Sequence, residues 1–200
     1  MKKLLVLAFI SIVGISNAQN ELPKTALEIA PLLIGEKIPA VTLLSSEGKT
    51  VNLLDSIQKQ KTIVVFYRGG WCPYCNIQLA ALGQNEQELL ALGFQIIAVS
   101  PDAPAALLQT DQKEKLNYLL LSDSKGELSK AMGLAFQAPE NYKPIITKGS
   151  EGVNTTFLPV PAVFFVDTNG LIQFEHITPD FKNRISSELL VAVAKEIGRA

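Results

Sequence analysis

The chain has 200 residues, 48% of them hydrophobic, and its 18 basic and 19 acidic side chains give a formal net charge of −1 at pH 7. This length suits one domain with a full hydrophobic core. The near-neutral charge excludes the basic footprint of a protein that binds nucleic acid or an anionic membrane surface. We therefore expect no nucleic acid among the partners.

The first 20 residues have the pattern of a secretory signal peptide. Lys2 and Lys3 precede an apolar run over 4–15, and Ser16-Asn17-Ala18 offers a cleavage site after Ala18. Because the run is shorter than the roughly 20 residues that span a bilayer, we expect no stable membrane insertion after cleavage. An uncleaved membrane anchor is the alternative. The sequence thus predicts an exported, periplasmic protein, divided into a signal peptide at 1–18, a lead segment at 19–31 and one domain at 32–200.

The domain is expected to begin with a β-hairpin. Residues 25–33 have a weakly helical pattern, and 41–44, 45–49 and 50–53 have the composition of a strand, a turn and a second strand. Residues 54–60 form a short predicted helix that leads into the central strand.

The central feature of the sequence is the stretch VVFYRGGWCPYC, which holds both cysteines of the chain. A run of strand formers at 63–67 ends at Gly69-Gly70, and Pro73 is placed for the first turn of a helix, where its missing N–H costs nothing. Cys72 is therefore expected at a helix N-terminus, where free amides and the helix dipole lower the pKa of a thiol from about 8.5 to roughly 3.5–7.5. Cys75 lies one turn further on the same face, near enough to attack a mixed disulfide on Cys72.

A single cysteine pair three residues apart favours a reactive dithiol over a structural disulfide, since so short a loop constrains the unfolded chain little. Zinc would need two further ligands, and the chain has one histidine. We predict Cys72 and Cys75 as the catalytic pair and expect neither a metal nor another cofactor.

The chain after the cysteines alternates helices with apolar strands, which predicts parallel βαβ units. Residues 135–156 mix proline, glycine and polar side chains with little periodicity, so we expect an irregular insertion there. The other expected elements are a helix over 76–92, a strand over 94–99, a helix from 104 or 105, a strand over 118–121, a strand within 158–167, its antiparallel partner over 171–176 and a helix over 181–197.

Four stretches carry a resemblance to a known family: FYRGGWCPYC at 66–75, LSDSKGELSKAMGL at 121–134, LPVPAVFFVD at 158–167, and TPDF at 178–181 followed by Arg184. Together they resemble the peroxiredoxin-like branch of the AhpC/TSA (alkyl hydroperoxide reductase/thiol-specific antioxidant) family, within the thioredoxin superfamily. The resemblance implies an α/β thioredoxin-like fold, a central mixed sheet flanked by helices with an N-terminal β-hairpin extension. It also implies a cis peptide bond between Val160 and Pro161, facing the cysteines, with the Val160 backbone free to pair with a partner.

Two enzymatic functions use this fold and this cysteine. Typical peroxiredoxins carry a Thr or Ser three residues before the reactive cysteine and an Arg on the facing strand, and those positions hold Gly69 and Pro161 here. The residues therefore favour disulfide exchange, in which Cys72 attacks and Cys75 resolves. The alternative is a thiol-dependent peroxidase with Cys72 as its peroxidatic cysteine, where Arg68 and the Gly-Gly amides hold the peroxide. A redox-inert binding module is a third possibility.

The expected partners are a protein or small-molecule thiol or disulfide, or a hydroperoxide, together with an external reductant. Trp71 and Tyr74 flank the cysteines and could offer a partner an apolar platform. Thioredoxins carry a buried Asp six residues before the first cysteine that assists proton transfer from the second cysteine, and Phe66 stands at that position in this chain. Asp102, which follows a neighbouring strand, is by position the remaining candidate to accept the proton of Cys75. A turn or a helix cap explains Asp102 as well.

Overall fold

The computed structural model describes residues 21–199, so the predicted signal peptide lies outside the described residues. Its strands are β1 (Thr42–Ser45), β2 (Thr50–Asn52), β3 (Lys61–Phe66), β4 (Phe94–Ser100), β5 (Leu119–Ser122), β6 (Ala135–Gln137), β7 (Phe157–Pro159), β8 (Ala162–Val166) and β9 (Ile172–Ile177). Its helices are α1 (Leu53–Ile57), α2 (Pro73–Ala91), α3 (Pro104–Glu114), α4 (Glu127–Ala131), the 3-10 turn η1 (Glu140–Tyr142), α5 (Lys143–Gly149) and α6 (Ser187–Gly198).

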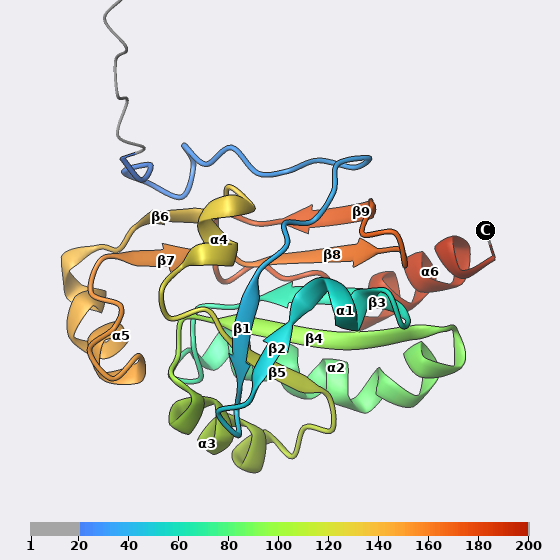
Figure 1. Ribbon diagram of the computed structural model, residues 1–200, viewed down its shortest axis with the longest axis horizontal. Helices are drawn as coiled ribbons and strands as arrows, with labels where there is room; N and C mark the ends of the chain where they lie inside the picture. The colour runs from blue at the N-terminus through green and yellow to red at the C-terminus, as the bar shows by residue number, and fades with distance from the viewer. Residues whose placement is uncertain (1–20, 200) are drawn as a thin grey trace, which may run out of the picture.

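Seven strands form one mixed sheet in the order β2-β1-β5-β4-β3-β8-β9, with helices on both faces (Figure 1). The strands β3, β4 and β5 run parallel, whereas β8 pairs antiparallel with β3 and β9 with β8. The β1–β2 hairpin joins the sheet antiparallel to β5. The predicted fold class, including the N-terminal hairpin, is confirmed.

The strand β3 is buried on both faces, as its run of β-branched residues requires. Ile63 and Val65 pack in the layer that contains residues of α2 and α6. Val64 and Phe66 pack in the opposite layer, with residues of α1 and α4. This packing on both faces fixes the strand. The residues that follow its carboxyl end therefore lie at the edge of the sheet where α2 begins, which is the usual place for a ligand or active site in an α/β sheet.

Two predicted helices differ from the structure. The helix over 25–33 is wrong: only one turn forms, from the Glu28 amide to the Thr25 carbonyl (3.2 Å), and the Leu32 amide donates to the Met132 carbonyl (3.1 Å). Packing on the domain has overridden a weak local preference. The last helix begins at 187 instead of 181, where the Ser186 hydroxyl caps it by accepting the Leu189 amide (3.2 Å).

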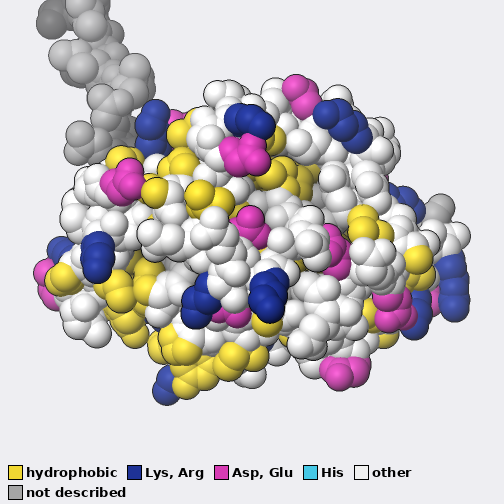
Figure 2. Space-filling view, turned by 90° about the horizontal axis from the view of Figure 1, so that it is seen from below, with side chains coloured by type: hydrophobic (Ala, Val, Ile, Leu, Met, Phe, Trp, Pro, Cys, Tyr) yellow, Lys and Arg dark blue, Asp and Glu magenta, His cyan; other side chains and the backbone are white. Residues whose placement is uncertain are grey.

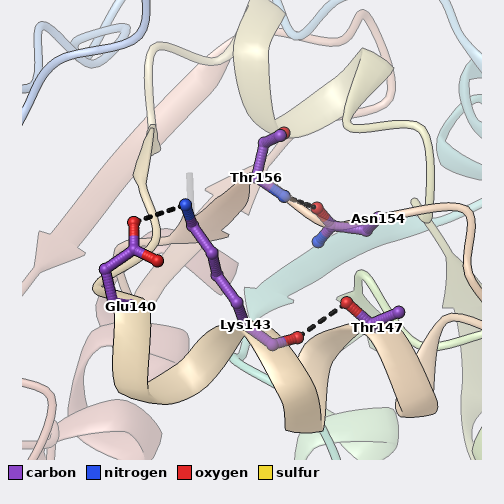
Figure 3. Close-up of polar contacts among 5 residues, drawn as sticks. All are labelled: Glu140, Lys143, Thr147, Asn154 and Thr156. Carbon is purple, nitrogen blue, oxygen red and sulfur yellow. Dashed lines mark hydrogen bonds and ion pairs between the residues drawn. The ribbon is translucent and has the colours of Figure 1, made fainter.

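The insertion at 135–156 is more regular than expected. It contains β6 and α5, and β6 pairs antiparallel with β7 in a separate two-stranded sheet. Side-chain interactions also stabilise its turns: Lys143 forms an ion pair with Glu140, and the Asn154 side chain accepts a hydrogen bond from the Thr156 amide (3.1 Å) (Figure 3). The insertion is therefore an ordered part of the domain.

Among residues 21–199, no helix combines the length and the apolar composition needed to cross a bilayer. Figure 2 views the side of the molecule on which α2 and α3 lie, and basic and acidic side chains are interspersed on that face.

Candidate active site

Two hydrogen bonds fix the loop between β3 and α2. The Gly70 amide donates to Asp102 Oδ2 (2.7 Å), and Asn76 Nδ2 donates to the Gly70 carbonyl (2.9 Å). Cys72 is the N-cap of α2 and Pro73 is its first residue, as predicted. The loop thus holds one sulfur at the positive end of a 19-residue helix.

The backbone of this loop explains why no hydroxyl stands three residues before Cys72. Gly69 has φ +141°, and a Cβ there would collide with Trp71 Nε1 and lie 2.9 Å from Asp102 Oδ1. A Thr or Ser at this position would displace the Trp71 indole. The Gly70 amide is not free for a peroxide either, because it donates to Asp102.

The two cysteines are free thiols, and both are buried: Cys72 is 1% exposed and Cys75 is fully enclosed. Several effects together lower the pKa of Cys72 to about 6 against the opposing effect of burial: the hydrogen bond from the Cys75 thiol is the largest, followed by the hydrogen bond with the Cys75 backbone and the charges of Arg68 and Arg184. Burial is the main effect that raises the pKa of Cys75, and the neighbouring Cys72 thiolate raises it further. The reduced pair therefore holds a thiolate on Cys72 and a proton on Cys75 at neutral pH.

Arg68 is buried and is not a solvated loop charge. Its guanidinium carbon lies 4.1 Å from the ring centre of Phe181, 4.3 Å from Tyr142 and 5.0 Å from Trp71. No carboxylate within 21–199 forms an ion pair with it. These cation–π contacts retain the side chain close enough for its charge to act on Cys72.

Arg184 is a site residue that the sequence analysis missed. Its Nη2 donates to Cys75 Sγ (3.4 Å), its Nη1 to Gln78 Oε1 (3.0 Å) and its Nε to the Phe181 carbonyl (2.9 Å). It also lines a small cavity together with Pro161 and Gln78. The sequence marks Arg184 only as part of a family-like string and assigns it no role, because it lies 109 residues from Cys75 and in a segment expected to be helical.

The predicted cis bond before Pro161 is wrong, since residues 21–199 contain no cis peptide bond. The Val160 backbone is not free for a partner either. Its amide donates to the Leu134 carbonyl (2.9 Å), its side chain is fully buried, and the Pro161 carbonyl accepts the Thr178 amide (3.0 Å). The chain's own residues thus occupy the Val160 amide, which a bound peptide would otherwise use.

Trp71 and Tyr74 do not form one open platform. Trp71 is half-buried, with its ring 5.6 Å from Tyr142. Tyr74 is 39% exposed and packs edge-on against Phe181. It lines a groove of about 390 Å³ between α2 and the segment before α6, and Arg184 lies in the wall of the same groove.

Within residues 21–199, no group of three or more His, Cys, Asp or Glu side chains is placed to hold a metal ion. The chemistry available is that of the sulfurs. A thiolate at a helix N-terminus, with a second thiol one turn away and two guanidinium groups beside the pair, defines a thiol-based oxidoreductase.

Comparison with known proteins identifies the family. A model of the AhpC/TSA family matches residues 34–175. Peroxiredoxin Bcp of Escherichia coli (strain K12) is 30% identical over 166 residues, which cover 83% of this chain and 97% of that protein. This chain therefore belongs to the AhpC/TSA family and is a peroxiredoxin-like enzyme of the thioredoxin superfamily.

Solved peroxiredoxin structures share the fold. Reduced Prx3 of Vibrio vulnificus in complex with hydrogen peroxide has a TM-score of 0.70 at 16% identity, covering 82% of this chain and 99% of that one. Peroxidoxin BcpB of Mycobacterium tuberculosis has a TM-score of 0.66 at 15% identity, covering 83% of this chain and 96% of that one.

Proposed function

We propose that the protein is a thiol-dependent peroxidase in which Cys72 attacks a hydroperoxide and Cys75 resolves the product. The observation that carries the proposal is the burial of the Cys72 thiolate: the residue is only 1% exposed, and two arginines lie near it. A hydroperoxide is small enough to reach such a sulfur after a minor opening. A protein disulfide has to bring its own backbone and align its S–S bond with the attacking sulfur, which needs far more access.

Family membership and the name of the E. coli relative support the same function. Disulfide exchange, which the CxxC motif favours, has less support than the sequence suggests. Its second argument is a cis-proline beside a free Val160 backbone, whereas the peptide bond is trans and the Val160 amide donates to the Leu134 carbonyl.

The reaction balances with the groups present. The Cys72 thiolate attacks the terminal oxygen of ROOH, the O–O bond breaks, and the alkoxide takes a proton from water to leave as ROH. Cys72 is then a sulfenic acid. Cys75 attacks the Cys72 sulfur, the S–S bond forms, the S–O bond breaks, and the hydroxyl leaves as water with the proton of Cys75. An external dithiol reduces the disulfide and is itself oxidised.

Arginines take the place of the missing family residues. The family's facing Arg position falls on Pro161, and Arg184 reaches the same neighbourhood from the segment before α6, since the two line one cavity. Arg68 supplies a second charge that acts on Cys72. A preorganised cation such as Arg68 stabilises the charge that develops as the O–O bond breaks, whereas Arg184 contacts the sulfur of Cys75.

Stopped-flow oxidation of the reduced protein tests the proposal, because Trp71 is the only tryptophan and reports on the loop. We expect hydrogen peroxide to react far faster than with a free thiol at the same pH, and insulin disulfides to react slowly. Cys72→Ser should abolish turnover, and Cys75→Ser should accumulate a dimedone-reactive sulfenic acid. A peroxide rate like that of a free thiol, with fast insulin reduction, would instead make the protein a disulfide reductase, and inertness to both would favour a binding module.

We also propose that the protein is exported to the periplasm. The supporting feature is the sequence of residues 1–18, with two lysines, an apolar run and a small residue at the cut. The mass of the protein from the periplasmic fraction should correspond to a chain that begins at Gln19. An intact chain found in the cytoplasm would contradict this.

A further inference from the structure

The resolving cysteine needs help to react. Cys75 is fully buried, and burial and the Cys72 thiolate both raise its pKa, so that it keeps its proton. The position from which thioredoxins aim a carboxylate is Phe66, whose side chain packs in the opposite layer of the sheet against Phe164. Asp102 accepts the Gly70 amide and lies on the Trp71 side of the loop.

Arg184 is the cation in contact with the Cys75 sulfur. Its Nη2 donates to Cys75 Sγ at 3.4 Å, and its two other hydrogen bonds, to Gln78 Oε1 and the Phe181 carbonyl, fix the direction of the guanidinium. No carboxylate among residues 21–199 forms an ion pair with it. Gln78, itself buried, acts as a positioning residue.

We propose that Arg184 is a catalytic residue of the resolving step, in which it holds Cys75 as the attacking thiolate once Cys72 has lost its charge. The inference rests on the proposed function for the identity of that step. It assigns to a guanidinium the role that a buried carboxylate has in thioredoxins: a carboxylate takes the proton, whereas the guanidinium stabilises the anion that the proton leaves behind.

Oxidation of Cys72 is what makes the contact effective. In the reduced pair, the negative charge on Cys72 opposes ionisation of Cys75, and Arg184 acts against it. A sulfenic acid is neutral, so its formation removes the opposing charge and leaves the cation. The ionisable groups that face Cys75 are Cys72, Arg184 and Tyr67, and burial raises the pKa of Tyr67 so that it stays neutral.

The proton of Cys75 also has a destination. Arg184 lines the groove of about 390 Å³ beside α2, but Cys75 is fully buried and does not line it. The proton of Cys75 therefore passes to the hydroxyl that departs from Cys72. This path yields one disulfide and one water.

The expected size of the effect follows from thiol reactivity. An opposite charge in contact lowers a pKa by about one unit or more. Each unit by which the pKa rises cuts the thiolate fraction about tenfold but makes the thiolate about threefold more nucleophilic, so the net loss in rate is about three- to fourfold.

The first experiment is a single turnover with hydrogen peroxide on Arg184→Gln and Arg184→Lys, with Lys182→Gln as the matched control from the same groove. Oxidation of Cys72 should change by less than about twofold, since Arg184 is the last and smallest cause of its lowered pKa. Disulfide formation should slow about three- to fourfold in Arg184→Gln, and sulfinic acid on Cys72 under excess peroxide should rise by the same factor. The Lys variant should recover part of the rate, and the control should match wild type.

A second measurement needs no peroxide. In a Cys72→Ser background, the thiolate absorbance of Cys75 at 240 nm should titrate about one pH unit higher when Arg184 is replaced by Gln. An unchanged titration together with unchanged disulfide formation would overturn the proposal. If Cys72 does not react with peroxide but the titration shifts, the peroxidase function fails while the action of Arg184 on Cys75 stands. Far-UV circular dichroism checks that the variants fold, and Arg184→Lys serves if the Gln variant does not.

Discussion

The charge on Cys72 should depend more on Cys75 than on the arginines. Of the groups that lower the Cys72 pKa from 9.0 to about 6, the hydrogen bond from the Cys75 thiol contributes most. Cys75→Ala removes that donor, whereas Cys75→Ser keeps a hydroxyl in its place. We therefore expect the Cys72 pKa to rise by about one to two units in the Ala variant and to stay near 6 in the Ser variant.

The assay should follow a pH midpoint rather than a rate at one pH. At pH 7 a thiol with pKa 6 is about nine-tenths ionised and one with pKa 8 about one-tenth, but the more basic thiolate is also the better nucleophile, so the two effects nearly cancel in a rate. Alkylation by iodoacetamide from pH 4.5 to 9.5, or thiolate absorbance at 240 nm, reports the midpoint directly. Both variants carry one cysteine, so the assignment is unambiguous.

A midpoint near 6 in Cys75→Ala would refute this reasoning. It would mean that the helix N-terminus and the arginines hold the Cys72 thiolate without Cys75. The Ser variant is the control that separates loss of a donor from loss of volume, since the two substitutions differ mainly in the hydroxyl.

Three further changes test the surroundings of the pair. Burial raises the pKa of Asp102 from 3.8 to about 6. The stability that this carboxyl contributes is therefore full below about pH 4 and is lost as the pH rises through 6. In urea titrations, Asp102→Asn should be up to about 3 kcal/mol more stable than wild type at pH 7 and no different near pH 4. Arg68→Met removes the cation held by three rings and should slow peroxide oxidation about tenfold in stopped flow, an unchanged rate excluding a role for its charge. Gly69→Ser restores the hydroxyl of typical family members, but its Cβ meets the indole of Trp71. This variant should therefore lose about 2 kcal/mol or more of stability and react with peroxide no faster than wild type. A faster, stable variant would show that the loop can rearrange.

The part of the site that local sequence encodes could be predicted. Strand formers, a glycine pair and Pro73 place Cys72 at the start of α2 without reference to the rest of the chain, and the structure has the helix begin there. The alternation of apolar segments likewise predicts the order of the strands and helices. These features depend on neighbours within a few residues.

The rest depends on residues that meet only after folding. Arg184 reaches Cys75 across 109 positions, and its segment is kept out of α6 by the Ser186 cap. The Val160 amide is taken by Leu134, which no local pattern reveals. The buried state of Arg68 likewise requires Tyr142 from the insertion and Phe181 from the far end of the chain.

In the proposed peroxidase cycle, Arg68 and Arg184 act on different sulfurs. Arg68 acts on Cys72, and Arg184 donates to Cys75. No carboxylate among the described residues forms an ion pair with either, so both charges are available to an anion in the site. In that cycle the negative charge lies on Cys72 before the peroxide arrives and on Cys75 during resolution, and a cation lies beside each position. On this proposal the site needs no hydroxyl at Gly69 and no guanidinium at Pro161, although typical members of the family carry both.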